Sequence, residues 1–209
     1  LLRLNAAVFY NEIVNKQSSI VAVLGGGVIQ FTNAEDTEIK GVEFDLVTSP
    51  LPNWNPGFTI TANAAYLEGE YKKFTNGDGF DEETGVFVDG IDHSGNEIER
   101  TPKLSGGLAL IQLFNLPWGD EFEVAVDAYY NSGFFYSAQN SDIYTEDKYT
   151  ITNARISYLY VPWNLRLTAF GQNVLGEKYH LGLFQTDFGI NSSLAYPERY
   201  GLRLNWSLE

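Results

Sequence analysis

Hydrophobic and polar residues alternate with a period of two along most of this chain. The last segment shows the pattern best, because one set of apolar and aromatic residues shares a face: Tyr200, Leu202, Leu204, Trp206 and Leu208. A strand separates two such sets onto its two faces, whereas a helix scatters them around its circumference. The alternation predicts eight strands and no helix. They are the opening and closing segments and those near 38–48, 57–71, 100–114, 121–136, 148–161 and 164–178.

The connections between the predicted strands alternate between short and long. Three are compact, at 49–56, 116–120 and 161–164, and they hold five of the seven prolines. Proline suits turns and is excluded from the centres of strands. The other four connections are long and polar, at about 13–30, 72–100, 137–147 and 179–196. This strict alternation predicts an up-and-down antiparallel sheet with two unlike ends.

All four tryptophans belong to the end of the predicted sheet that carries the short turns. Trp54, Trp118 and Trp163 lie in the turns, and Trp206 lies near the end of the last strand. Amphipathic indole rings settle at the interface between a bilayer and water. We therefore predict a transmembrane barrel with these four residues at one membrane interface. A soluble core capped by four tryptophans is the less favoured alternative.

The two faces of the predicted strands differ in polarity. In hydrocarbon every backbone polar group must be paired within the protein, so strands span a bilayer only as a closed barrel. The apolar face would then meet lipid, and the other face would meet the lumen. The alternation alone does not show whether the apolar face points outward, as in a membrane barrel, or inward, as in a soluble ligand-carrying barrel. The position of all four tryptophans at one end of the sheet favours the membrane barrel. The predicted lumen-facing residues are Arg3, Glu43, Asp45, Asp127, Arg155, Arg166 and Arg203.

Composition removes several classes of protein. The formal net charge of −14 excludes nucleic acid as a partner, because binding to phosphates requires stripes of Lys and Arg. The absence of Cys excludes disulfides, thiolate nucleophiles and Cys-ligated metals. No apolar run approaches the ~18 residues of a membrane helix. The absence of Met predicts a processed protein or a piece of a longer one.

Several segments resemble the C-terminal part of the barrel of a TonB-dependent outer-membrane receptor. They include Lys40-Gly41-Val42-Glu43-Phe44-Asp45, Thr101-Pro102-Lys103-Leu104-Ser105-Gly106-Gly107, Gly171-Gln172-Asn173-Val174-Leu175-Gly176-Glu177-Lys178-Tyr179 and the closing Pro197-Glu198-Arg199-Tyr200-Gly201-Leu202-Arg203-Leu204. The order and spacing of these motifs carry the resemblance over nearly the whole chain. Such receptors have about 22 strands around a plugged lumen, whereas eight strands and no plug are present here.

The resemblance implies a set of partners and a location. The partners are the lipid bilayer, the remaining strands and plug of a parent receptor, and an inner-membrane energy-coupling complex that acts through the plug. The implied location is the bacterial outer membrane. One departure concerns the terminus, because these barrels usually finish on an aromatic residue and this chain finishes Trp206-Ser207-Leu208-Glu209.

Two features suggest other chemistry. The 75–99 segment is strongly acidic and its oxygen ligands could hold Ca²⁺, but Phe80 breaks the spacing of an EF-hand, so a solvated loop is favoured. Asp92-His93-Ser94 suggests a hydrolase, but neighbours in sequence rarely form a productive triad. His180 is predicted to be an interfacial polar residue, since a lone histidine lacks the partners of a metal site. No catalytic residue, metal site or cofactor is predicted.

The sequence therefore favours an all-β segment of a receptor that takes up a scarce, bulky nutrient: a ferric siderophore, haem, cobalamin or a glycan. Two alternatives stay open, a self-contained eight-stranded outer-membrane barrel with a structural or adhesive role, and a barrel enzyme. Aromatic residues of the long loops are candidate contacts with the ligand: Phe134, Phe135, Tyr144, Phe184 and Phe188.

Overall fold

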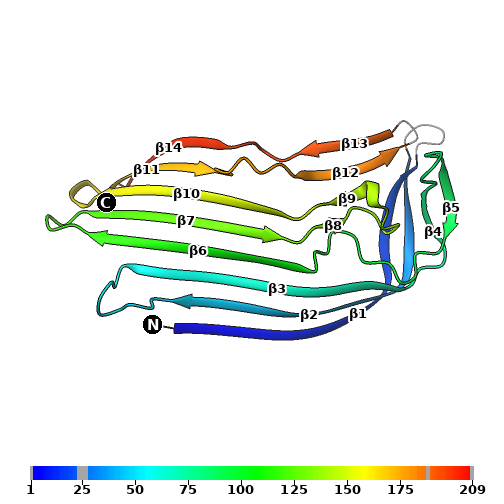
Figure 1. Ribbon diagram of the computed structural model, residues 1–209, viewed down its shortest axis with the longest axis horizontal. Coiled ribbons are helices and arrows are strands. Elements are labelled where there is room, and N and C mark those ends of the chain that lie inside the picture. Colours follow the sequence, from blue (N-terminus) through cyan, green and yellow to red (C-terminus); the bar gives the residue numbers. More distant parts are fainter. Residues whose placement is uncertain (1, 23–27, 187–188, 208–209) are drawn as a thin grey trace.

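One antiparallel sheet of eight strands dominates the computed structural model, which describes residues 2–22, 28–186 and 189–207 (Figure 1). Its strands neighbour one another in chain order: β1 (Leu2–Ala22), β2 (Val28–Thr48), β3 (Phe58–Lys73), β6 (Leu104–Asn115), β7 (Glu121–Asn131), β10 (Tyr149–Tyr160), β11 (Leu165–Gln172) and β14 (Arg199–Trp206). Every pairing within this sheet is antiparallel. The predicted all-β, up-and-down architecture is confirmed.

The long connections contain small hairpins of their own. The remaining elements are β4 (Gly77–Phe80) with β5 (Phe87–Ile91), β8 (Phe134–Phe135) with β9 (Thr145–Glu146), β12 (His180–Thr186) with β13 (Gly189–Leu194), and the 3₁₀ turns η1 (Asp142–Tyr144) and η2 (Val161–Trp163). Within the described ranges, no helix has the length and hydrophobicity needed to cross a membrane. The hairpins all lie at the end opposite the short turns (Figure 1).

The register of the sheet separates the two faces as the alternation predicts. Residues that pair across neighbouring strands share a face. Asp45 pairs with Asn63, Asp127 with Asn153, and Arg203 with Thr168. Followed from strand to strand, these pairs place all seven predicted lumen residues on one face. The opposite face carries large exposed side chains, including Val8 at 83% and Leu202 at 75%.

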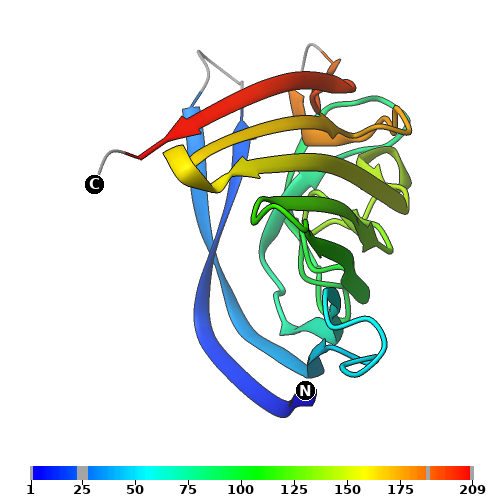
Figure 2. The same ribbon diagram turned by 90° about the vertical axis from the view of Figure 1, so that its left-hand side faces the viewer.

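The sheet does not close on itself. β1 and β14 are its two edges, and they do not pair with each other in the described part of the chain. Figure 2, which looks along the strands, shows a curved sheet like a section of a barrel wall. A self-contained eight-stranded barrel would require that missing pairing.

Several predicted boundaries were wrong. The strand near 100–114 begins at Leu104, and the strand near 121–136 ends at Asn131. Much of the polar connection at 13–30 is strand, because β1 and β2 continue as one long hairpin whose backbone pairing runs from Leu2–Thr48 to Ala22–Val28. The predicted strand at 164–178 ends at Gln172. There Asn173 adopts a φ of 51°, and its side-chain amide pairs with the backbone of Glu177 at 2.8 and 2.9 Å, which closes a turn.

The buried core lies among the long loops, and the sheet itself has little of it. Its members are Ala34, Tyr71, Phe74, Ile98 and Ala138. The rings of Tyr71 and Phe74 are 5.1 Å apart, and Phe74 meets His93 edge to face at 5.2 Å. We call this assembly of residues 71–99 and 134–146, with the outer parts of β1 and β2, the outer layer. A sheet that is solvated by lipid needs no core of its own, whereas loops in water do.

Gly57 closes the short turn between β2 and β3, and its replacement by alanine should destabilise the protein. A methyl group there would overlap the carbonyl oxygen of Leu113, whose amide donates to the Gly57 carbonyl at 2.9 Å. We expect Gly57→Ala to cost about 1–3 kcal/mol in urea unfolding from vesicles. Gly182→Ala is the control, since the atom nearest to a methyl group added there is a side-chain nitrogen of Arg100, 3.9 Å away. Equal stability of the two variants would contradict the predicted overlap.

Candidate functional site: the wall and the outer layer

The four tryptophans lie at the end of the sheet that carries the short turns, three in the turns and Trp206 at the end of β14. Their exposed fractions run from 63% to 85% for Trp54, Trp118, Trp163 and Trp206. Asp120 ties two of these turns together, because it accepts hydrogen bonds from the Tyr158 hydroxyl and, at 3.0 Å, from the Val161 amide. Exposed indoles on a rigid rim suit a membrane interface. Their depth in a bilayer stays a prediction.

The polar face of the sheet is partly neutralised by its own residues. Arg155 pairs with Glu123 at 3.1 Å and Arg166 with Glu121 at 3.8 Å, and the Asn153 amide donates to Asp127 at 2.8 Å. The Arg203 guanidinium lies 5.5 Å from the centre of the Phe170 ring. By contrast, three predicted lumen residues form no ion pair, side-chain hydrogen bond or cation–π contact with any residue that the structure describes: Arg3, Glu43 and Asp45. A face of this kind suits water or a polar partner.

Side-chain amides join the loops of the outer layer. Gln139 makes a two-way pair with the backbone of Phe80, at 3.0 and 2.7 Å. Asn140 does the same with the backbone of Glu97, at 2.6 and 2.9 Å. Asn96 donates to the Ala138 carbonyl at 2.8 Å. The loop at 137–141 is thus hydrogen-bonded to the segments around Phe80 and around Glu97. These bonds join the three segments of the outer layer into one unit.

An ion pair joins the β1–β2 hairpin to this unit. Lys16 Nζ lies 2.6 Å from Glu99 Oε1 and 3.0 Å from the Tyr71 hydroxyl, which itself donates to Glu99. Burial acts to raise the pKa of the Glu99 carboxyl. The hydrogen bonds from Lys16 and Tyr71, together with the Lys16 charge, outweigh burial and hold that pKa below its ordinary value. Sequence patterns gave no signal for this pair, because its members are far apart in the chain.

The lowered pKa of Glu99 predicts that acid loosens the outer layer. A carboxyl with a depressed folded pKa stabilises the fold above its unfolded pKa, about 4.5, and this stabilisation is lost as pH falls through the folded value. We expect hydrogen exchange of residues 94–99 to accelerate below that pH. Glu99→Gln should abolish the pH dependence, and Glu82→Gln, at an exposed position, should leave it intact. An unchanged pH profile in Glu99→Gln would refute the assignment.

A buried carboxylate, that of Glu146, holds the β12–β13 hairpin. Glu146 Oε2 accepts hydrogen bonds from the Tyr136 hydroxyl at 2.8 Å and the His180 amide at 3.0 Å, and His180 Nδ1 lies 3.2 Å away. Burial, followed by the bond to Glu146, raises the pKa of the Tyr136 hydroxyl. Arg100 lies 5.1 Å from the Tyr136 ring centre. His180 is therefore bonded to a carboxylate of the outer layer, a role that the sequence did not reveal.

The predicted ligand contacts differ in their exposure. Phe184 is 50% exposed on β12, and Phe134 and Phe135 are half-buried on β8. The ring of Phe134 packs against Tyr136 at 5.0 Å. Tyr144 is only 4% exposed, and burial raises the pKa of its hydroxyl to about 12, so it has little surface to offer a ligand. Phe188 lies outside the described residues.

The acidic segment at 75–99 gives no support to a catalytic triad. His93 is 1% exposed and its Nε2 lies 3.0 Å from the Asp78 carbonyl oxygen, while Ser94 Oγ accepts from the Phe74 amide. Asp92 accepts from the Ser94 amide at 2.9 Å, so Asp92-His93-Ser94 forms a structural turn. Across the part of the chain that the structure describes, no group of three or more His, Asp or Glu residues could hold a metal ion.

Solved structures with a similar fold are receptors. The siderophore receptor PiuA from Acinetobacter baumannii aligns with a TM-score of 0.72 and 20% identity, over 98% of this chain and 26% of that one. The ferric yersiniabactin uptake receptor FyuA from Yersinia pestis gives 0.72 and 13%, over 96% and 27%. FpvA from P. aeruginosa, solved with heterologous pyoverdines, gives 0.63 and 13%, over 98% and 24%. The chain spans about a quarter of the length of each.

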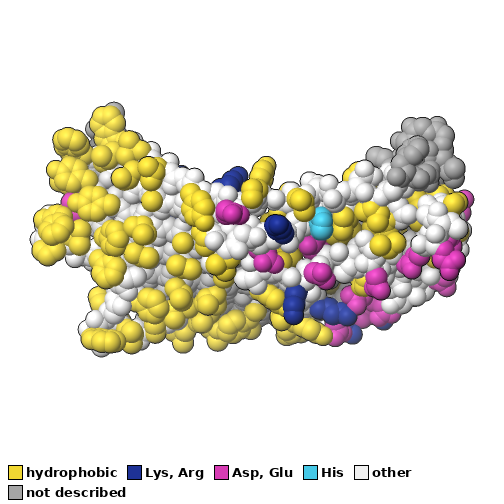
Figure 3. Space-filling view, turned by 45° about the horizontal axis from the view of Figure 1, so that its top comes forward, with side chains coloured by type: hydrophobic (Ala, Val, Ile, Leu, Met, Phe, Trp, Pro, Cys, Tyr) yellow, Lys and Arg dark blue, Asp and Glu magenta, His cyan; other side chains and the backbone are white. Residues whose placement is uncertain are grey.

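The sequence also matches a family directly. The family described as "TonB dependent receptor-like, beta-barrel" matches residues 1–174, which is most of the chain. Hydrophobic side chains gather over the short-turn half of the molecule and acidic ones over the outer layer, as a wall that crosses a membrane requires (Figure 3). The chain belongs to the β-barrel family of the TonB-dependent receptors.

Proposed function

We propose that this chain forms part of the barrel wall of an outer-membrane receptor that imports a bulky nutrient. The family match over residues 1–174 carries this proposal. The open sheet supports it, because its two edges would pair with further strands of a complete barrel. In that arrangement the polar face, where Arg3, Glu43 and Asp45 form no ion pair with any described residue, would contact a plug. Energy would reach the plug from an inner-membrane complex.

A ferric siderophore is the ligand class that we favour over haem, cobalamin or a glycan. Solved structures with a similar fold include a siderophore receptor, a ferric yersiniabactin uptake receptor and FpvA in complex with iron-loaded pyoverdines. The outer layer offers the half-buried Phe134 and Phe135 as apolar contacts, and the adjoining strand β12 offers the exposed Phe184. Bulky aromatic surface of this kind binds ligands with apolar or aromatic groups.

Uptake by cells tests the proposal. The full-length protein, expressed in a host that lacks its own siderophore receptors, should accumulate radioactive iron from a panel of ferric siderophores. Accumulation should stop when the proton-motive force is collapsed. Phe184→Ala should weaken uptake of the accepted compound, and Ile190→Ala, on the paired strand β13, serves as its control. Uptake of haem, cobalamin or a glycan instead would correct the ligand class. Failure with all four classes would contradict the proposal.

The eight-stranded barrel and the barrel enzyme predict a different native protein. A mass measurement on the protein from its source separates them from the receptor. A polypeptide several times longer than 209 residues agrees with a receptor, and one of about this length agrees with a small barrel. A monodisperse, heat-resistant barrel formed by the isolated chain would also favour the small barrel, since unpaired edges in lipid cost several kcal/mol per group.

A further inference from the structure

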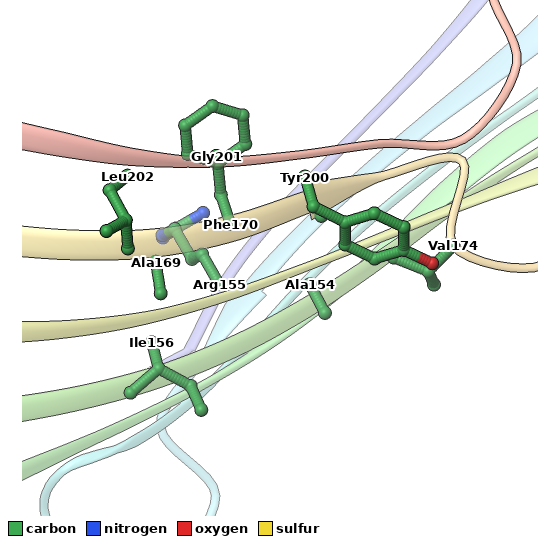
Figure 4. A pocket seen from close by; sticks show the side chains of 10 residues that line it. Ala154, Arg155, Ile156, Ala169, Phe170, Val174, Tyr200, Gly201 and Leu202 are labelled. Carbon is green, nitrogen blue, oxygen red and sulfur yellow. The ribbon is translucent and has the colours of Figure 1, made fainter.

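A groove runs along the apolar face of the sheet above β11 (Figure 4). Two rows of paired residues cross it, Ile156–Ala169–Leu202 and Ala154–Gly171–Tyr200, with β11 in the middle of each row. The groove has a volume of about 560 Å³, within the range of ligand pockets, but it is open along its length.

Small residues at three adjacent positions make this groove. Ala154, Ala169 and Gly171 form its floor, while Ile156 and Leu202, 50% and 75% exposed, rise on either side. Val174 and Tyr200 bound it at the end toward the outer layer, and the Tyr200 ring leans so close to Gly171 that a methyl group there would lie 2.9 Å from it. Arg155 and Phe170 belong by register to the opposite face of the sheet.

The groove runs from near the middle of the predicted membrane band into its outer half. Leu202 and Tyr200 precede Trp206 by four and six residues on β14, which corresponds to ~10 Å and ~15 Å along the membrane normal at the tilt of barrel strands. The apolar band of such barrels is ~25 Å tall. A groove between Leu202 and Val174 therefore extends from near the bilayer midplane into the hydrocarbon of the outer leaflet.

We propose that this groove binds the acyl chain of an outer-leaflet lipid. It is continuous with the apolar face that a transmembrane barrel presents to hydrocarbon. The hydrophobic effect does not select an occupant of this groove, because lipid tails are as apolar as leucine. The occupant is selected by the area of van der Waals contact that it makes with the groove. A void above the three small residues would forfeit dispersion contacts. A narrow, flexible chain reaches the floor of the groove, whereas a second convex barrel would touch only the ridges formed by Ile156 and Leu202.

Photolabelling of the full-length protein tests this site. The protein is placed in phosphatidylcholine vesicles with a trace of phosphatidylcholine that carries a diazirine on its acyl chain, and labelled peptides are identified by mass spectrometry. Peptides that contain Ala154 and Ala169 should be labelled several-fold more than the peptide around Ala62. Ala62 lies on the same face, between Leu46 and Leu108.

Filling the groove provides the matched comparison. Ala169→Phe should reduce labelling of the groove to the level at Ala62, and Ala62→Phe should leave labelling of the groove unchanged. Heat-modifiable migration in electrophoresis reports that each variant has folded. Uniform labelling of the face, or no effect of Ala169→Phe, would overturn the proposal. The measurement does not involve transport, so its outcome is independent of the proposed function.

Discussion

Replacement of Leu202 by arginine is expected to destabilise the barrel by about 2–4 kcal/mol, the cost of an arginine near the bilayer midplane on the lipid face. Leu202 is 75% exposed on β14, pairs with Ala169 on the apolar face and precedes Trp206 by four residues, or ~10 Å along the membrane normal. A charged group there must leave water without gaining a partner. Urea unfolding of the full-length protein from vesicles measures the change.

The neighbouring residue supplies the control. Arg203 lies on the opposite face, where its guanidinium covers the Phe170 ring. Arg203→Leu should lose only this contact, which is worth about 0.5–1 kcal/mol at an exposed site. Equal losses from the two variants would contradict the assignment of the faces, and a larger loss from Arg203→Leu would reverse it.

Replacement of Phe74 by alanine should open the outer layer without affecting the wall. Phe74 is 1% exposed and its ring contacts both Tyr71 and His93. Loss of a buried phenylalanine costs about 3–5 kcal/mol, through lost transfer energy and the cavity that remains. Hydrogen exchange of residues 71–99 should therefore accelerate strongly, because this segment supplies much of the core of the outer layer.

A second substitution in the same segment controls for surface effects. Val86 is 57% exposed, so Val86→Ala should change the opening free energy derived from hydrogen exchange by no more than about 0.5 kcal/mol. Hydrogen exchange in β10 and β11 should be unaffected by either variant, since neither strand contributes a residue to the core cluster. If Phe74→Ala accelerated exchange throughout the wall, the outer layer would not be a separate unit.

The wall could be predicted from the sequence because its physics is local. Each strand must present apolar residues to one side and polar residues to the other, so alternation such as Leu202-Arg203-Leu204 marks both the strand and its faces. The three short turns could be found from proline and tryptophan. The end of β11 could not be found, since Asn173 stops the strand through a turn made by its own side chain.

The outer layer escaped prediction because its contacts join distant parts of the chain. Glu146 and His180 are 34 residues apart, and Lys16 and Glu99 are 83 apart. The acidic composition of 75–99 indicated a solvated loop, yet Phe80 and His93 within it are buried. Outside the predicted membrane band, contact with lipid does not require apolar and polar residues to alternate along a strand. β1 and β2 therefore continue as strands through polar residues for which the sequence predicted a loop.

Labelling of single cysteines on intact cells tests the central claim most directly, that this chain crosses the outer membrane with its long loops outside. Glu83, exposed between β4 and β5, and Asn53, exposed in the first short turn, lie at opposite ends of the sheet. These 209 residues contain no cysteine of their own, and any cysteine elsewhere in the full-length protein is replaced by serine beforehand. In the full-length protein, a membrane-impermeant thiol reagent should label Glu83→Cys on intact cells and Asn53→Cys only after lysis. Labelling of Asn53→Cys from outside, with Glu83→Cys protected, would contradict this topology.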